Sequence, residues 1–249
     1  MKIVGVIPAR MGSSRFPGKP MALICNKPMI EHVYKRSAMS KTLDDLYVAT
    51  CDKEIYDAVI AFGGKAIMTG DCHERCTDRI AEAIQNIDAD IIVNIQGDEP
   101  LIYPDMIDEA LKPLLEDDSI VCSNLMAEIK DDADFEDPNE VKVVVDQNNF
   151  ALYFSREAIP SKKKGATGVK GRKQVCVIPF RRDFLIKYTQ LPPTPLEVIE
   201  SVDMLRAMEH GYKVKMVWTD YDTCSVDTLD DLKKVEEIMK TDRLFKEYT

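Results

Sequence analysis

This sequence of 249 residues has no long hydrophobic run, few histidines, and fewer basic than acidic residues. No apolar stretch reaches the roughly 18 residues that suggest a membrane-spanning helix. The three histidines, His32, His73 and His210, form no recognisable catalytic set. A formal net charge of −10 argues against general nucleic-acid binding, which needs a broad basic surface. Because the chain opens into a strand-like run rather than a secretion signal, we expect a cytoplasmic protein with no membrane partner.

The cysteine pattern argues against a disulfide framework and offers little support for a metal site. Seven cysteines, an odd number, are scattered through apparent strands and helices, and we expect them to be reduced. The segment Cys72-His73-Glu74-Arg75-Cys76 contains zinc-type ligands. No second Cys or His pair follows at a matching spacing, so the pattern does not predict a zinc site.

Short apolar runs alternate with helical patterns along the first half of the chain. Residues 2–7 and 90–95 are β-branched runs typical of buried strands, and 104–115 has the pattern of a helix. Such alternation predicts βαβ units, and therefore an α/β fold with a Rossmann-like, mainly parallel sheet flanked by helices.

The pattern changes after about residue 130. Residues 141–146 and 151–155 predict a β-hairpin, and 195–210 predicts a helix. We expect one domain spanning residues 1–249, with an inserted β-rich subdomain at roughly residues 128–190.

The loop that follows the first strand gathers cations in an otherwise acidic chain. Residues 8–20 contain Arg10, Arg15 and Lys19 together with Gly12 and Gly18. A turn of small residues can bring backbone N–H groups close to a polyanion, and the cations can neutralise phosphate charge. The alternative is an ordinary basic surface loop. Pro20 after Gly18-Lys19 excludes a nucleoside-triphosphatase P-loop, and the glycine spacing excludes the dinucleotide fingerprint.

Carboxylates follow two other predicted strands. Asp98 lies in Gln96-Gly97-Asp98-Glu99-Pro100, directly after the strand at 90–95, and Asp227 precedes the predicted last helix. Ligands of an open parallel sheet bind beyond the carboxyl ends of its strands. A carboxylate that faces a phosphate-binding loop needs a cation between them, and Mg²⁺ is the usual one. The alternative for both residues is a helix-capping acidic turn.

A second basic segment, residues 161–173, is rich in lysine and glycine. It is either a mobile solvated loop or a lid over an anionic substrate.

Ordered segments along nearly the whole chain resemble the 3-deoxy-manno-octulosonate (Kdo) cytidylyltransferase family. They are Ile7–Arg10 continuing through Gly18-Lys19-Pro20, Asn94–Pro100, Asn139–Val144, Ala151–Arg156, Pro195–Glu197 and Val226–Thr228. The resemblance implies transfer of CMP from CTP to an acidic sugar with release of pyrophosphate, dependence on Mg²⁺, and a homodimer built through the inserted subdomain.

The resemblance also implies roles for individual residues. Arg10, Lys19, Asp98 and Asp227 would be catalytic, and Asp98 and Asp227 would bind Mg²⁺. The CTP-binding residues would be Ala9, Arg10, Gly12, Ser13, Ser14, Arg15, Lys19, Thr77, Arg79 and Gln96. The acceptor-binding residues would be Lys142, Arg156, Gln174, Phe180, Glu197 and Asp203.

The chain departs from the family pattern at the acceptor positions. A family histidine is replaced by Gln174, two tyrosines by Ile178 and Phe180, and a Glu-Gln pair by Asp203-Met204. Loss of polar groups changes specificity when a site is built to bind hydroxyls. The pattern therefore favours an acceptor other than standard Kdo: another 3-deoxy-2-ulosonic acid, an amino-substituted Kdo, or a small phosphonate or phosphorylated acid. Standard Kdo is the alternative. A nucleotidyltransferase for another base and a nucleotide-binding regulator without turnover are further alternatives.

Overall fold

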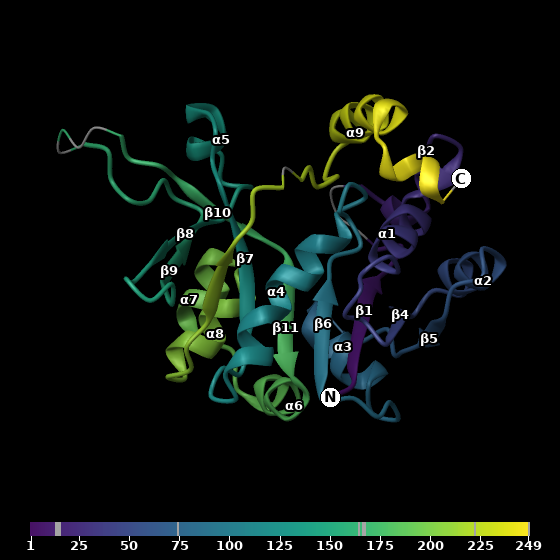
Figure 1. The fold of residues 1–249 in the computed structure, drawn as a ribbon, viewed down its shortest axis with the longest axis horizontal. Coiled ribbons are helices and arrows are strands. Elements are labelled where there is room, and N and C mark those ends of the chain that lie inside the picture. The colour runs from purple at the N-terminus through teal and green to yellow at the C-terminus, as the bar shows by residue number, and fades with distance from the viewer. Residues whose placement is uncertain (13–15, 74, 164, 166–167, 222, 249) are drawn as a thin grey trace. The chain divides into compact units, whose positions relative to one another are not determined.

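The computed structural model describes residues 1–12, 16–73, 75–163, 165, 168–221 and 223–248. The chain divides into two compact units, which we describe separately (Figure 1). The first unit comprises Met1–Asp108 and Thr223–Thr249, and the second comprises Glu109–Asp222. The subdomain expected at roughly residues 128–190 lies within the range of the second unit.

The first unit is built on four parallel strands. They are β1 (Ile3–Ala9), β4 (Asp45–Thr50), β5 (Ala66–Met68) and β6 (Ile91–Ile95). Their order is β6-β1-β4-β5, and each neighbouring pair is parallel. Every residue of β1 and β6 is buried, as expected for apolar β-branched strands covered on both faces. The predicted mainly parallel sheet is confirmed.

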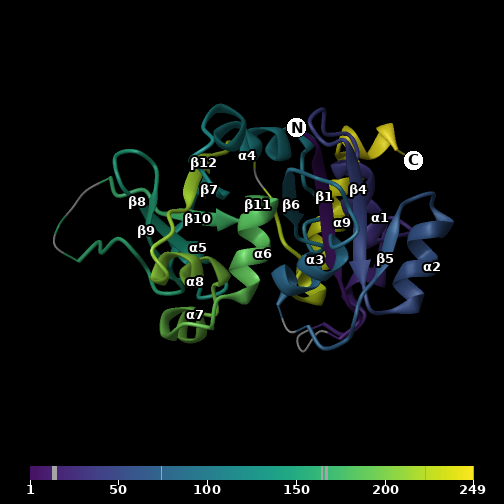
Figure 2. The ribbon, with the colours of Figure 1, turned by 90° about the horizontal axis from the view of Figure 1, so that it is seen from below.

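The first unit contains helices that cover this sheet and helices that form the C-terminal part of the unit. They are α1 (Met29–Ser37), α2 (Lys53–Ala61), α3 (Cys76–Ala83), α9 (Leu229–Thr241) and the 3-10 helices η1 (Lys19–Met21) and η2 (Leu244–Glu247). Both α1 and α3 contact β1 (Figure 2). Helix α9 instead contacts β2 (Leu23–Ile24), which pairs with β3 (Lys27–Pro28).

An apolar cluster joins the C-terminal segment to the residues around η1. Its buried members are Ile24, Met29, Leu101, Val226, Val235 and Met239. The N-terminal loop, the loop after β6 and the segment before α9 therefore share one core. Within the described part of the chain, no helix has both the length and the apolar character that a membrane crossing requires.

The second unit contains a mostly antiparallel sheet. Its strands are β7 (Ser123–Glu128), β8 (Lys142–Val145), β9 (Ala151–Ser155), β10 (Arg172–Val175) and β12 (Lys215–Trp218), in the order β12-β7-β10-β8-β9. Only the β12–β7 pair is parallel among them. The predicted hairpin is confirmed as β8 and β9. Strand β11 (Val177–Arg181) follows β10, and Phe180 forms an antiparallel bridge with Cys122.

The helix predicted over residues 195–210 is wrong in one respect, because the chain breaks it at Ser201. Ser201 has a left-handed backbone, with φ 53° and ψ 47°, and ends α7 (Pro195–Glu200). A new helix, α8 (Asp203–Glu209), begins after an extended Val202. The remaining helices of this unit are α5 (Asp132–Glu136) and α6 (Arg182–Gln190), and α4 (Pro104–Glu116) contains the point where the chain passes between units.

Candidate functional site

Two strand-end loops of the first unit lie against each other. Strands β1 and β6 are parallel neighbours, so the loops that follow Ala9 and Ile95 leave the same edge of the sheet. A Cβ atom at Gly97 would lie only 3.0 Å from the carbonyl oxygen of Pro8. Glycine at this position therefore allows the close approach of the second loop to the end of β1.

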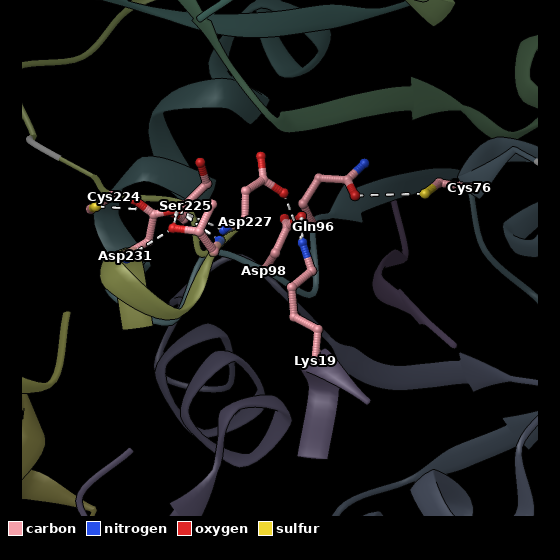
Figure 3. Close-up of polar contacts among 9 residues, drawn as sticks. Lys19, Cys76, Gln96, Asp98, Cys224, Ser225, Asp227 and Asp231 are labelled. Atoms are coloured by element: carbon pink, nitrogen blue, oxygen red, sulfur yellow. Dashed lines mark hydrogen bonds and ion pairs between the residues drawn. The ribbon is translucent and has the colours of Figure 1, made fainter. Parts of the chain in front are cut away.

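Lys19 connects this edge of the sheet to the segment before α9. Its Nζ donates to Asp98 Oδ2 at 2.8 Å and to Asp227 Oδ1 at 3.1 Å (Figure 3). Only 13% of the Lys19 side chain is exposed, against 30% for Asp98 and 25% for Asp227. The structure thus brings together three residues that the sequence analysis took from three separate segments.

The electrostatics of this cluster keep Lys19 charged. Burial acts to lower the pKa of Lys19, but attraction and hydrogen bonding to Asp98 and Asp227 outweigh it. The pKa is raised above its ordinary value of 10.5. One ammonium therefore neutralises part of the charge of two carboxylates that converge on it.

The alternative that Asp227 is a helix cap is wrong. Thr228 is the N-cap of α9, and its side chain accepts from the N–H of Asp231 at 3.2 Å. The Asp231 carboxylate completes the capping box by accepting from the N–H of Thr228 at 2.8 Å, and it also accepts from the N–H of Asp227 at 3.1 Å. The Asp227 carboxylate is therefore left to face Lys19.

A backbone hydrogen bond closes the basic loop that precedes Lys19. The N–H of Gly18 donates to the carbonyl of Met11 at 3.0 Å, and Gly18 has a φ of 74° that favours glycine. Ala9 is buried at the end of β1, whereas Arg10 and Gly12 are exposed. The predicted CTP-binding residues Ser13, Ser14 and Arg15 lie outside the described residues.

Asp52 is a residue of this site that the sequence analysis missed. It follows β4, the other neighbour of β1, and its Oδ2 accepts from the N–H of Met11 at 2.8 Å. An acidic residue directly after a predicted parallel strand was the available signal. Asp52 holds the start of the basic loop in place.

Thr77 and Arg79 are buried rather than open to solvent. The Arg79 Nη1 donates to Thr69 Oγ1 at 2.6 Å and to the carbonyl of Gly70 at 3.1 Å. Arg79 therefore supports the chain after β5. Gln96 lies in the loop after β6, and its Oε1 accepts from the Cys76 thiol at 3.6 Å (Figure 3).

The segment 72–76 holds no metal cluster within the part that the structure describes. No group of three or more His, Cys, Asp or Glu side chains suited to a metal ion occurs among the described residues, and Glu74 lies outside them. His73 instead pairs with Glu82. The carboxylate of Glu82 also accepts from the N–H of Gly70 at 3.0 Å, so this pair stabilises the loop before α3.

In the second unit, Lys142 and Arg156 bind backbone carbonyl groups. The buried Lys142 Nζ donates to the carbonyls of Asp137 at 2.7 Å and Arg156 at 2.6 Å. Burial lowers the pKa of Lys142 below its ordinary value of 10.5. The Arg156 guanidinium donates to the carbonyls of Glu200 at 2.7 Å and Pro138 at 2.8 Å. Both predicted acceptor-binding cations thus have structural partners.

Glu197 and Phe180 are also engaged inside the second unit. Both carboxylate oxygens of the buried Glu197 accept from Arg206, at 2.6 and 2.7 Å. Phe180 is buried and stacks on Phe184 with a ring-centroid distance of 6.4 Å. Asp203 is partly exposed, and its backbone carbonyl accepts from the Tyr188 hydroxyl at 2.7 Å.

Gln174 is held by a buried asparagine that the sequence analysis missed. The Gln174 amide donates to Asn124 Oδ1 at 2.5 Å, and the Asn124 amide donates to the carbonyl of Val175 at 2.6 Å. These contacts fix the orientation of both amides, because Asn124 must present its oxygen to Gln174. Gln174 itself is partly exposed on β10.

Acidic residues of the same unit pair with cations of the second basic segment. Lys162 lies 2.6 Å from Asp132, Lys170 lies 2.8 Å from Glu128, and Lys173 lies 3.1 Å from Glu140. These three lysines are the charges that a lid would present to an anionic substrate, and each already has an acidic partner within the chain. Residues 164, 166 and 167 of the expected loop or lid lie outside the described residues.

Comparison with known proteins identifies the family of this chain. The sequence pattern of the cytidylyltransferase family matches residues 4–216. A 3-deoxy-manno-octulosonate cytidylyltransferase of Geotalea uraniireducens is 48% identical over 250 residues, covering 96% of this chain and 100% of that protein. The protein of the same name from Geobacter metallireducens is also 48% identical, covering 95% of this chain and 97% of its own length.

Solved structures support the same assignment. A CMP:2-keto-3-deoxy-manno-octonic acid synthetase complexed with CTP matches with a TM-score of 0.91 and 41% identity, covering 96% of this chain and 99% of that one. A 4-diphosphocytidyl-2C-methyl-D-erythritol synthase from Anaerococcus prevotii shares only the fold, with a TM-score of 0.64 and 14% identity over 96% of this chain and 99% of that one. The chain therefore belongs to the 3-deoxy-manno-octulosonate cytidylyltransferases, CTP-dependent nucleotidyltransferases within the cytidylyltransferase family.

Proposed function

We propose that this enzyme transfers CMP from CTP to Kdo with the help of Mg²⁺. The anomeric hydroxyl of the acceptor attacks the α-phosphorus, the bond to the β-phosphate oxygen breaks, pyrophosphate leaves and the hydroxyl proton passes to solvent. The observation that carries the proposal is the convergence of Lys19, Asp98 and Asp227 at one edge of the sheet. Phosphoryl and nucleotidyl transfer depend on positioning and charge neutralisation, and this cluster offers both.

The basic loop is proposed to bind the triphosphate. Arg10 belongs to the same loop as Lys19 and is exposed. Ala9 ends β1 and Gly12 follows it in the loop, so both could offer backbone N–H groups to a phosphate. Arg10 and Lys19 would neutralise phosphate oxygens, with Ser13, Ser14 and Arg15 assigned to the same loop from the family resemblance. Asp52 positions this loop through the N–H of Met11. Gln96, Thr77 and Arg79 are assigned to the nucleotide side, where Arg79 acts through Thr69 and Gly70.

Asp98 and Asp227 are proposed to bind Mg²⁺. The two carboxylates already converge on one cation, the Lys19 ammonium. Mg²⁺ is usually bound by one or two protein carboxylates, with phosphate oxygens and water as its other ligands. When bound, Mg²⁺ draws charge from the phosphate oxygens. Asp98 and Asp227 would orient the ion, and the Val226 N–H, which donates to the Asp98 carbonyl at 2.9 Å, keeps their two segments together.

The departures from the family pattern suggested an acceptor other than Kdo, but two observations favour Kdo itself. The relatives are named for that acceptor, and two of the departing residues are buried. Ile178 and Phe180 are buried, so these replacements for tyrosine contribute to the core of the second unit. Gln174 and Asp203 are partly exposed and are proposed to contact the acceptor directly. Lys142 and Arg156 would shape the acceptor-binding region by holding backbone carbonyl groups in place. Glu197 would do so through its ion pair with Arg206.

The test is pyrophosphate release from CTP and Mg²⁺ with a panel of acceptors: Kdo, amino-Kdo, a sialic acid, a phosphonate and a phosphorylated acid. We expect turnover with Kdo, loss of turnover in EDTA, and recovery on addition of Mg²⁺. Lys19→Ala is expected to lower turnover by orders of magnitude while the protein stays folded. Turnover only with another acid would reassign the acceptor, turnover only with another nucleotide would reassign the base, and CTP binding without turnover would indicate a regulator.

We also propose a homodimer formed through the second unit, in which the expected inserted subdomain lies. Exposed apolar side chains in this unit include Leu152, Val198 and Ile199. A second copy would remove such apolar surface from water. Light scattering should report twice the chain mass, and Ile199→Asp should shift the protein toward the monomer. Ile60→Asp, at an exposed apolar residue of the first unit, is the control.

A cytoplasmic location is the remaining proposal. Its support is that none of the seven cysteines, all of which lie among the described residues, forms a disulfide. A reducing compartment keeps thiols in that state. Cell fractionation with an antibody against the chain tests this, and recovery outside the cytoplasmic fraction would contradict it.

A further inference from the structure

The ammonium of Lys19 lies where a metal ion would be expected to contact Asp98 and Asp227. It is 2.8 Å from one carboxylate and 3.1 Å from the other, and its side chain is largely buried between them. A lysine ammonium is a compact, strongly hydrated point charge on a flexible stem. The ammonium and a divalent cation would compete for the same carboxylate oxygens.

The carboxylates need a cation because their segments are tied together. The Val226 N–H donates to the backbone carbonyl of Asp98 at 2.9 Å, directly beside Asp227. Asp227 is anchored in turn, because its N–H donates to Asp231 at 3.1 Å. The backbones that carry the two charges therefore cannot separate without breaking these hydrogen bonds, which keeps the two carboxylates near enough to repel each other.

We propose that Lys19 closes the metal site of the nucleotide-free enzyme and opens it by moving its ammonium to the triphosphate of CTP. This inference rests on the proposed function, because it takes CTP and Mg²⁺ as the ligands. It assigns Lys19 two successive partners: the carboxylates first, and the phosphates when the nucleotide arrives. Mg²⁺ and CTP then bind cooperatively, since each favours the state in which Lys19 has left the carboxylates.

The proposal predicts that removal of the Lys19 charge tightens metal binding in the absence of nucleotide. The experiment measures Mn²⁺ binding by electron paramagnetic resonance, with the metal alone and no CTP or acceptor. We expect weak binding to the unaltered enzyme and binding at least tenfold tighter to Lys19→Met. Lys19→Arg keeps the charge and should bind Mn²⁺ as weakly as the unaltered enzyme. In Lys19→Met combined with Asp98→Asn, the gain should disappear.

Lys53 provides a matched control. It is an exposed lysine of the first unit that pairs with the carboxylate of Asp57 at 2.7 Å. Lys53→Met changes the net charge as Lys19→Met does, so it should leave Mn²⁺ affinity unchanged. A tightening in Lys53→Met equal to that in Lys19→Met would assign the effect to overall charge and overturn the proposal.

Two further results would overturn it. They are tight Mn²⁺ binding by the unaltered enzyme without nucleotide, and equal affinity of the unaltered enzyme and Lys19→Met. If Lys19→Met is unfolded without metal, its refolding during a Mn²⁺ titration, followed by circular dichroism, supplies the affinity, and failure to refold counts against the proposal. The measurement involves no turnover, so inactivity of the unaltered enzyme with CTP and Kdo would overturn the proposed function alone.

Discussion

The carboxylate of Asp52 accepts a hydrogen bond from the backbone N–H of Met11 at 2.8 Å. The two residues follow β4 and β1, which are adjacent parallel strands. The contact links the end of one strand to the loop that follows the other. It fixes the first part of the basic loop while Arg10, one residue earlier, remains exposed.

Asp52→Ala should weaken CTP binding. A hydrogen bond to a charged group is worth about 1.5–3 kcal/mol, so we expect the KM for CTP to rise about tenfold or more with a smaller change in kcat. Steady-state kinetics with CTP as the varied substrate measures this. Asp52→Asn keeps an acceptor oxygen and should recover most of the affinity, whereas equal loss in both variants would show that charge rather than loop position is responsible.

Gly97→Ala should disturb the loop that carries Asp98. The added Cβ would lie 3.0 Å from the Pro8 carbonyl oxygen, so one of the two backbone segments would have to shift by a few tenths of an ångström. Overpacking of this kind costs about 1–3 kcal/mol, so the melting temperature should fall. Gly70→Ala is the control, because its nearest contacts are ordinary ones at 3.5 Å. A Gly97→Ala variant as stable and active as the unaltered enzyme would show that the close approach does not depend on glycine.

Glu197→Ala should destabilise the protein strongly. It leaves the Arg206 guanidinium buried without the carboxylate that now accepts from it at 2.6 and 2.7 Å. Breaking a buried ion pair in this way costs about 3–5 kcal/mol. Urea unfolding measures the loss. Glu197→Gln combined with Arg206→Met removes both charges and should be more stable than Glu197→Ala, while a fully stable Glu197→Ala would indicate that the pair has no structural role.

The stability of the first unit should fall as the pH is lowered below about 6.5, the ordinary pKa of histidine. Burial first, and then the Arg36 charge, lower the pKa of His32, although the Ile24 carbonyl and Glu31 oppose this. At a pH between the pKa of His32 in the folded protein and its higher pKa in the unfolded chain, the unfolded chain binds more protons. The free energy of unfolding therefore has its full value above the pKa of the unfolded chain and decreases as the pH falls below it. Urea unfolding at pH 7.5 and 5.5 measures this slope.

His32→Gln provides the comparison for that measurement. His32 is buried, its Nε2 donates to the Ile24 carbonyl at 2.8 Å, and its Nδ1 accepts from the Tyr248 hydroxyl at 2.8 Å. The neutral ring satisfies both contacts, whereas protonation would add a second charge near Arg36. The variant should lose stability at pH 7.5 but lose less between pH 7.5 and 5.5 than the unaltered protein. An identical slope in both proteins would assign the pH dependence to other groups.

Much of the fold and of the first-unit site could be predicted from local patterns. Apolar β-branched runs have a period and length that indicate buried strands, and this predicted β1 and β6. Glycine and charge directly after those strands indicated Lys19 and Asp98. The break at Ser201 could not be predicted in the same way, because a serine in the left-handed region leaves no distinct signal in an otherwise helical pattern.

The fold class, the family and the residue types at the strand ends follow from the amino-acid sequence alone, because these depend on local periodicity and on motif order. Which of these residues meet depends on how the chain folds. Lys19 and Asp227 are 208 positions apart, and only the folded chain places their charges in contact. The fold also gives Glu197, Lys142 and Arg156 partners within the protein. Burial and long-range electrostatics depend on which segments pack together, and no spacing along the chain encodes that.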